Sequence, residues 1–146
     1  MMDPDLEARP PRVPEAHFAS VTPEQISTLV DDFYGVIRAD ARLGPIFDGV
    51  IGDNWPRHMV RMKAFWRSVL LKTGEYGGRP VPAHMAIPDL ETDDFRRWLG
   101  LFEDVVGRVM DTQAAPHVLA AARRIARSLW MARFATPFDP VPEWLA

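Results

Sequence analysis

The stretch that decides the fold runs from Asn54 to His84 and reads NWPRHMVRMKAFWRSVLLKTGEYGGRPVPAH. Its apolar residues recur at steps of three and four, which predicts one long helix with a single apolar face: Trp55, Met59, Met62, Phe65, Trp66, Val69 and Leu70. His58 lies on that same face. Asn54 is the predicted N-cap of this helix and Gly74 its predicted stop.

A glycine-rich turn separates His58 from a second histidine, His84, which lies between Pro82 and Pro88. Two imidazoles arranged in this way could flank a flat ligand from opposite sides. The spacing also fits a helical hairpin with one hydrogen-bonded histidine in the core and another at the surface. Spacing alone favours that simpler interpretation.

Composition excludes several classes of protein. A chain of 146 residues, 47% of them hydrophobic, suits one domain with a substantial core. The absence of cysteine excludes disulfides, thiolate metal sites and thiol nucleophiles. A net charge of -3 argues against nucleic acid as the main partner. No apolar run approaches the roughly 20 residues of a membrane span, and the first twenty residues do not resemble a secretory segment. We therefore expect a cytoplasmic protein without a membrane partner.

The remaining helices are marked by their ends. Thr22 and Gln25 form a predicted capping box around Pro23, and an apolar stripe follows. The segment from Asp40 to Gly49 is interpreted as a turn and a short tight segment, because Gly44 and Pro45 break helices. Thr92 is the predicted cap of a third long helix, and the last helix is predicted to begin near Pro116.

The predicted fold class is all-α, since no strand-like alternation is present. Residues 1–20 are interpreted as a loose proline-rich arm, residues 21–135 as the folded domain and residues 136–146 as a proline-rich tail. The acidic pairs are interpreted as solvated groups at helix surfaces or helix starts: Asp31-Asp32, Asp93-Asp94 and Glu103-Asp104.

The sequence contains no phosphate loop, zinc helix or serine elbow. The polar groups that remain near apolar stripes are those of His58, His84, Tyr34 and Trp98. Neutral imidazole is a good iron ligand, and an apolar all-helical cavity suits a porphyrin. For Trp98 the simpler interpretation is core packing, and for Tyr34 an edge position with its hydroxyl in water.

An ordered set of short runs resembles the truncated haemoglobin family, and most closely its third group, from about Val21 to Phe134. The runs are Asp32-Phe33-Tyr34, Leu43-Gly44-Pro45-Ile46-Phe47, His58 with Phe65-Trp66, Leu70-Leu71-Lys72-Thr73-Gly74-Glu75-Tyr76, Pro82-Ala83-His84-Met85-Ala86-Ile87-Pro88 and Trp98-Leu99-Gly100-Leu101-Phe102. The glycine pairs that mark other groups of the family are not where those groups have them.

The resemblance implies a two-over-two helical sandwich around one haem b. His84 corresponds to the proximal iron ligand. Three residues correspond to the distal groups that face a bound gas: Tyr34, His58 and Trp98. Three more correspond to the haem pocket, with Phe47 packed on the porphyrin and the other two along the distal wall: Phe47, Met62 and Trp66. In some relatives the distal histidine instead swings out as a gate.

The implied function is reversible binding of dioxygen, or of carbon monoxide or nitric oxide, at ferrous iron, for retention or ligand chemistry rather than bulk delivery. Two alternatives stay open from the sequence. One is a haem enzyme, a peroxidase or nitric oxide dioxygenase, which would need an external reductase because the chain has no flavin or nicotinamide motif. The other is a haem-free helical interaction module.

Overall fold

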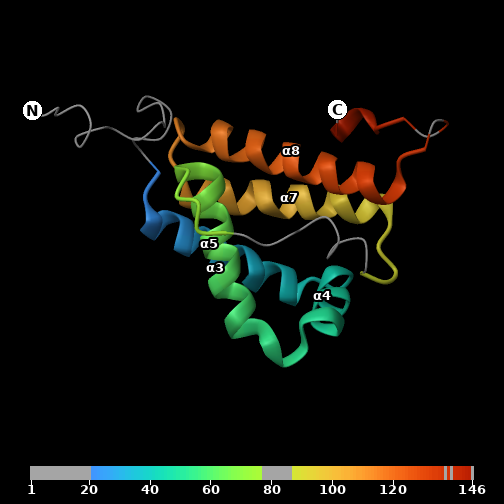
Figure 1. Ribbon diagram of the computed structural model, residues 1–146, viewed down its shortest axis with the longest axis horizontal. Helices are drawn as coiled ribbons and strands as arrows, with labels where there is room; N and C mark the ends of the chain where they lie inside the picture. Colours follow the sequence, from blue (N-terminus) through green and yellow to red (C-terminus); the bar gives the residue numbers. More distant parts are fainter. Residues whose placement is uncertain (1–20, 77–86, 137, 139, 146) are drawn as a thin grey trace, which may run out of the picture.

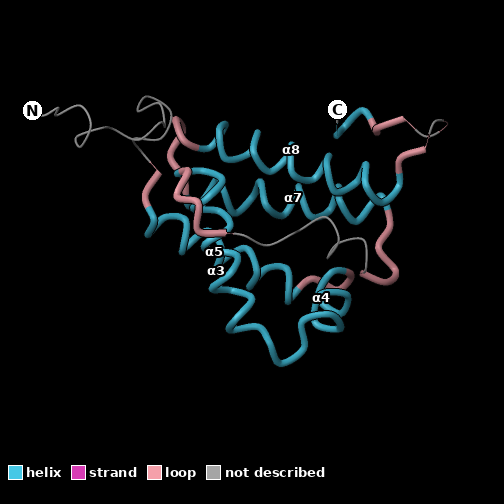
Figure 2. The backbone as a smooth tube through the Cα atoms, viewed as in Figure 1, coloured by secondary structure: helices cyan, strands magenta, loops and turns pink. Residues whose placement is uncertain are grey.

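A computed structural model describes residues 21–76, 87–136, 138 and 140–145. Within these ranges every regular element is a helix and no strand is present (Figure 1, Figure 2), which confirms the all-α prediction. The elements are α3 (Pro23–Ala39), α4 (Leu43–Ile51), the 3-10 turn η1 (Gly52–Asn54), α5 (Trp55–Leu71), α7 (Thr92–Val109), α8 (Ala115–Phe134) and the 3-10 turn η2 (Glu143–Leu145). His84 and the predicted arm, residues 1–20, lie outside the described residues.

The long helices pack as two pairs. Helices α7 and α8 lie side by side and run in opposite directions, while α3 and α5 cross below them (Figure 1). Helix α3 packs against α7, and α5 packs against both α3 and α8. The arrangement is therefore a two-over-two helical sandwich, as the resemblance implies.

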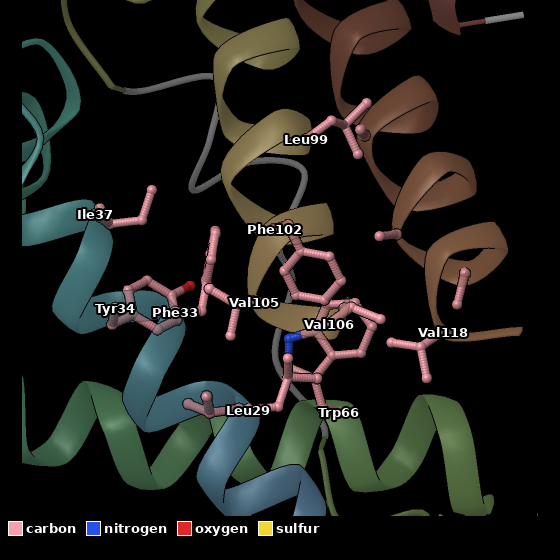
Figure 3. Close-up of a cluster of buried hydrophobic side chains, with 14 of the residues drawn as sticks. Leu29, Phe33, Tyr34, Ile37, Trp66, Leu99, Phe102, Val105, Val106 and Val118 are labelled. Atoms are coloured by element: carbon pink, nitrogen blue, oxygen red, sulfur yellow. The ribbon is translucent and has the colours of Figure 1, made fainter. Parts of the chain in front are cut away.

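The core lies where the two pairs meet, and aromatic rings fill its centre (Figure 3). Phe33 of α3 meets Phe102 of α7 edge to face, with centroids 5.0 Å apart. Trp66 of α5 stacks against the same Phe102, with ring centroids 5.2 Å apart and an angle of 19° between the ring planes. Rings of this size bury much apolar area and hold defined orientations, so they fix how the pairs face each other.

Helix α3 begins as predicted. Gln25 donates its backbone N–H to the Thr22 hydroxyl at 3.1 Å, and Thr22 donates its backbone N–H to the Gln25 side-chain oxygen at 2.9 Å. Pro23 occupies the first turn, where a missing N–H leaves no helical bond unmade. The capping box predicted from the sequence is thus confirmed.

The segment after α3 is where the sequence prediction is wrong, because Leu43–Ile51 is helical rather than a broken turn. Pro45 lies in the first turn of α4, a position that tolerates proline. Gly44 is needed for a tertiary reason: a Cβ there would stand 2.6 Å from the carbonyl oxygen of Arg38. The glycine therefore lets the start of α4 approach the end of α3, and it does not stop the helix.

Two other helix ends differ from the predictions. Helix α5 ends at Leu71 rather than near Gly74, since Lys72 adopts the left-handed conformation with φ 61° and closes the helix. Asn54 is the N-cap of α5 as expected, but its side chain makes no capping hydrogen bond.

The N-cap of α7 is Glu91 rather than Thr92. Glu91 and Asp94 form a capping box, and the Thr92 hydroxyl instead accepts a hydrogen bond from the Trp130 indole at 3.0 Å. The interpretation of the acidic pairs as solvated groups is wrong for Asp94, because its side chain is only 5% exposed.

The C-terminal tail folds back onto α8. Arg123 donates to the carbonyl oxygen of Trp144 at 3.2 Å, and Leu145 is buried in the core. Among the described residues no helix has the length and apolar character that crossing a membrane requires.

Candidate functional site

A cavity of about 300 Å³ lies between α5 and the other long helices. The described residues that line it are Tyr34, Val50, Ile51, Asn54, His58, Arg61, Met62, Phe65, Trp66, Tyr76, Trp98, Ile125 and Leu129. Its volume is within the usual range for small-molecule sites, about 300–1,000 Å³. Aromatic and aliphatic side chains dominate the wall, with a few polar groups among them.

Tyr34 projects from α3 into this cavity and is 6% exposed, so the interpretation of an edge residue with its hydroxyl in water is wrong. Its ring contacts those of Phe33 at 5.2 Å and His58 at 5.3 Å, both edge to face. Burial raises the pKa of the Tyr34 phenol far above its ordinary value, and the nearby Tyr76 phenol adds to the effect. Tyr34 therefore keeps its proton and can act as a hydrogen-bond donor inside the cavity.

His58 faces the cavity from the first turns of α5, and its Nε2 atom is buried. The imidazole stands edge to face between Tyr34 and Trp55, with centroids 5.3 Å and 5.5 Å away. Trp55 is itself fixed, because its indole N–H donates to Asp48 at 2.8 Å and Arg38 lies over its ring at 4.5 Å. The aromatic neighbours thus set the orientation of the imidazole.

Trp98 reaches the cavity from α7. Its ring stacks on Phe102 at 5.3 Å and meets Phe33 edge to face at 5.1 Å. The side chain is only partly buried, and it also lines a smaller adjoining cavity of about 40 Å³ with Leu129. Trp98 therefore has both a packing role and a position at the wall.

The structure brings five of the seven predicted site residues to one cavity: Tyr34, His58, Met62, Trp66 and Trp98. Phe47 does not line it. Its ring lies against Tyr34, with centroids 6.4 Å apart, on the side of α4. His84 falls among the residues that the structure does not describe. Its role and the roles of the other six residues stay predictions.

Two further residues line the cavity that were not among the predicted site residues: Arg61 and Tyr76. Arg61 follows His58 by three positions, so helical spacing could have placed both on one side of α5. Tyr76 carried no periodic signal, because it follows the end of α5. Its backbone N–H donates to the Ser68 hydroxyl at 2.9 Å, and its ring meets Phe65 edge to face at 5.0 Å.

An ion pair next to Tyr76 stabilises the segment that follows α5. Arg67 binds both carboxylate oxygens of Glu75, at 2.9 Å and 2.7 Å, and these hydrogen bonds lower the pKa of Glu75 to about 2. These contacts with α5 therefore hold Tyr76 at the wall of the cavity.

The residues present fit a haem. The wall offers flat aromatic and aliphatic surfaces for a macrocycle, and the phenol of Tyr34 and the imidazole of His58 add polar groups to it. The guanidinium of Arg61, which is exposed, is suited to carboxylate groups at the rim. Such a lining suits a large apolar cofactor with polar edges.

Comparisons with known proteins agree with this geometry. No family model matches the chain. The chain is 34% identical over 112 residues to the group 3 truncated hemoglobin ctb of Campylobacter jejuni, covering 75% of this chain and 88% of that protein. The crystal structure of the group III truncated hemoglobin from Campylobacter jejuni superposes with a TM-score of 0.75 at 30% identity, covering 85% of this chain and 98% of that one. The sandwich, the cavity and these likenesses show that the chain belongs to the truncated haemoglobins and is most like their third group.

Proposed function

We propose that this globin binds haem b in the cavity beside α5 and reversibly binds dioxygen there. The observation that carries the proposal is the convergence of Tyr34, His58 and Trp98 on one apolar cavity. When bound, the haem supplies a ferrous iron to which diatomic gases bind, and His84 is its proposed protein ligand. Supporting evidence is membership of the truncated haemoglobins and the likeness to the Campylobacter jejuni group III structure.

The distal side chains determine how long a gas stays. Dioxygen would carry partial negative charge when it is held at a ferrous haem, so a donor that faces it would slow its escape. Burial raises the pKa of the Tyr34 phenol, so it keeps its proton near neutral pH and can act as such a donor. A hydrogen bond to a charged group contributes about 1.5–3 kcal/mol, and about 1.4 kcal/mol corresponds to tenfold in affinity. A pocket with such donors suits retention or chemistry of the ligand better than delivery.

The first experiment is an absorbance spectrum of the purified full chain, before and after addition of haemin. A haem spectrum that titrates to one equivalent supports the cofactor. A chain that takes up no haem would refute the proposal and favour the haem-free helical module.

The second experiment compares Tyr34→Phe with the wild type in stopped-flow release of dioxygen and carbon monoxide. Loss of the phenolic donor should speed dioxygen release by about ten- to a hundredfold. Carbon monoxide accepts a weaker hydrogen bond, so its release should change much less. Val60→Ala, a change on the exposed face of α5, is the matched control and should leave both rates unchanged.

A further inference from the structure

Three helices meet at a group of side chains beside the cavity, which we call the Trp55 cluster: Arg38 of α3, Asp48 of α4 and Trp55 of α5. Oδ1 of Asp48 accepts a hydrogen bond from the Trp55 indole N–H at 2.8 Å, and the same oxygen lies 3.4 Å from Nε of Arg38. The guanidinium of Arg38 also lies over the Trp55 ring, 4.5 Å from its centroid. The cluster therefore holds the indole both by its N–H and by its face.

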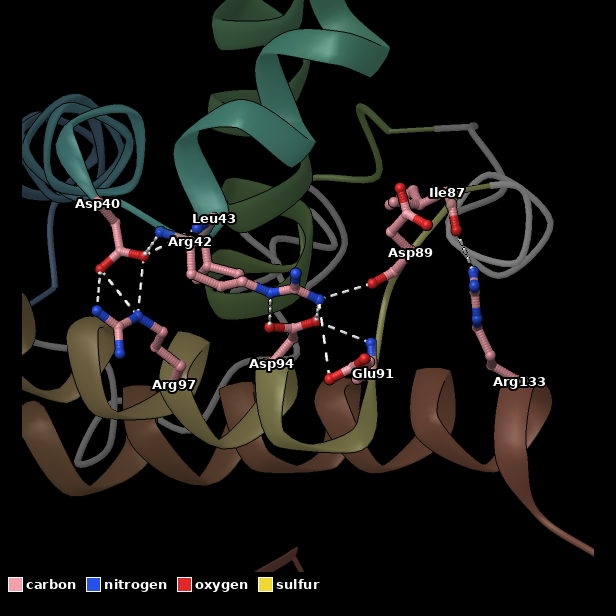
Figure 4. A network of polar contacts seen from close by, with 9 residues as sticks. All are labelled: Asp40, Arg42, Leu43, Ile87, Asp89, Glu91, Asp94, Arg97 and Arg133. Atoms are coloured by element: carbon pink, nitrogen blue, oxygen red, sulfur yellow. Dashed lines mark hydrogen bonds and ion pairs between the residues drawn. The ribbon is translucent and has the colours of Figure 1, made fainter.

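Helix α4 presents Asp48 from a fixed position. At the start of this helix, Leu43 donates its backbone N–H to Asp40 at 2.8 Å (Figure 4). Arg42 donates through Nε and Nη2 to the carboxylate of Asp94 on α7, both at 2.9 Å. At its other end α4 runs into η1 and then α5. Asp48 lies between these two attachments, so its carboxylate is a defined anchor for the indole.

Stability alone does not explain the charged part of the Trp55 cluster. The side chains of Arg38 and Asp48 are 52% and 49% exposed, and exposed ion pairs usually contribute little to folding stability. Trp55, in contrast, is buried. A surface ion pair that binds a buried ring acts mainly on the orientation of that ring.

The orientation of Trp55 matters for His58, which follows it by three positions and so lies on the same side of α5. The imidazole meets the Trp55 ring at 5.5 Å and the Tyr34 ring at 5.3 Å, both edge to face. The rings of Trp55 and Tyr34 also contact each other, with centroids 5.8 Å apart. Aromatic contacts of this kind are directional. The position of the imidazole therefore depends on where the indole is held.

The wall of the cavity reaches the protein surface close to His58. Three residues that line the cavity are exposed: Val50, Asn54 and Arg61. Asn54 precedes His58 by four positions and Arg61 follows it by three, so helical spacing places both next to it. An imidazole that turned toward this rim would leave the rings of Trp55 and Tyr34 and enter water. The contacts with these two rings oppose that movement.

We propose that Trp55 is a positioning residue for His58: held by Asp48 and Arg38, it keeps the imidazole inside the cavity and prevents it from turning out to the solvent. The inference rests on the proposed function, in which His58 faces a gas bound at the haem. Trp55 is not among the described residues that line the cavity, so it acts on the gas only through His58.

The first test uses the full chain without haem and measures the distance between His58 and Tyr34 by NMR. Their rings are close enough for a nuclear Overhauser effect between ring protons. The chain has four histidines, and loss of one signal in His58→Gln assigns that of His58. Trp55→Leu and Asp48→Ala should both weaken or abolish the effect, because the imidazole is then free to turn away from the phenol.

Asp31→Ala is the matched control. Asp31 is 54% exposed, much as Asp48 is, and it pairs with Lys63 at 3.0 Å, which also joins α3 to α5. Neither Asp31 nor Lys63 is among the described residues that line the cavity. The control should keep the nuclear Overhauser effect between His58 and Tyr34.

The second test uses the chain reconstituted with haemin and reduced, with the infrared C–O stretching band of bound carbon monoxide and the rate of dioxygen release as readouts. A polar group beside bound carbon monoxide lowers the frequency of this band. Trp55→Leu and Asp48→Ala should therefore add a band at higher frequency and should speed dioxygen release about tenfold, the effect of one lost hydrogen bond. In a His58→Leu background, Trp55→Leu should change neither readout further, because its effect passes through His58.

Wild-type behaviour of both variants in both tests would overturn the inference. A further change when Trp55→Leu is added to His58→Leu would also overturn it, because this would indicate a loosened cavity rather than a turned imidazole. An equal effect of Asp31→Ala would do the same. Asp48→Ala, at a half-exposed position, decides the question if Trp55→Leu does not fold. Failure of the proposed function looks different, since the wild type would then take up no haem while the NMR test would still report on His58.

Discussion

The indole of Trp98 lies parallel to the ring of Phe102, with centroids 5.3 Å apart and planes 3° from parallel. Phe102 in turn stacks on Trp66 from the opposite layer. The face of the Trp98 ring therefore packs on the core, and the same side chain forms part of the cavity wall. Packing and ligand binding make different demands on this one side chain, and they can be separated by experiment.

We predict that Trp98→Phe speeds dioxygen release by about ten- to a hundredfold with little effect on carbon monoxide release. Phenylalanine keeps a ring against Phe102, removes the N–H donor and trims some volume. Stopped-flow measurement of both release rates checks this, with the haem spectrum as a test of an intact pocket. Equal acceleration of both gases would indicate a loosened pocket, and no acceleration of either would leave Trp98 as a core residue only.

His84→Gly should lose haem or keep it only when imidazole is added, because His84 is the predicted protein ligand of the iron. The measurement is the absorbance spectrum after gel filtration, with and without imidazole. His117→Gln, a change at the start of α8 away from the cavity, should keep haem as the wild type does. Wild-type haem retention in His84→Gly without imidazole would show that another residue binds the iron.

Removal of residues 1–19 should leave the haem spectrum and dioxygen release unchanged, because the composition of this arm is that of a poorly ordered segment. Spectra and stopped-flow rates of the shortened chain are the check. A large change in either would mean that the arm reaches the haem.

Leu145→Ala should lower the free energy of unfolding by about 2 kcal/mol, the lower end of the usual cost for a buried leucine, because a single 3-10 turn such as η2 can partly collapse around the gap. Leu145 is 2% exposed, so the alanine leaves a gap beside α8. Urea unfolding measures the change, and Phe138→Ala, at an exposed position of the same tail, is the control. An equal loss in both variants would argue against a specific role for Leu145.

Acid should weaken the fold in a defined pH window through Asp40. Hydrogen bonds from Arg97, and then from the backbone N–H groups of Leu43 and Arg42, lower its pKa from 3.8 to about 2. A carboxyl whose pKa is lower in the folded state contributes stability above pH 3.8, and that contribution is lost as the pH falls to about 2.

The free energy of unfolding of the wild type should therefore drop across this window. Asp40→Asn should be less stable at pH 7 and should show a shallower drop. Asp31→Asn, which changes a more exposed carboxyl paired with Lys63, is the control. An unchanged acid profile in Asp40→Asn would show that other carboxyls carry the effect.

Local signals in the sequence predicted most of the helices. The capping box of Thr22 and Gln25 and the stripe that contains His58 and Trp66 involve residues within one or two turns of each other, so their meaning does not depend on the rest of the chain. The all-α class, the start of α3 and the start of α8 were predicted on this basis. The resemblance carried by ordered runs added the sandwich and five residues that line one cavity.

Tertiary structure decided what depends on distant partners. Gly44 and Pro45 read locally as helix breakers, yet α4 forms. Pro45 lies in the first turn of the helix, and Gly44 allows the start of the helix to approach the carbonyl oxygen of Arg38. Asp94 read as a solvated acid, yet it is buried because Arg42, 52 residues earlier, supplies a matching fork. A residue's own neighbours in sequence determine its helical propensity and its place on a helix face. Its burial, its charge partner and the cavity it lines depend on segments that only the folded chain brings together.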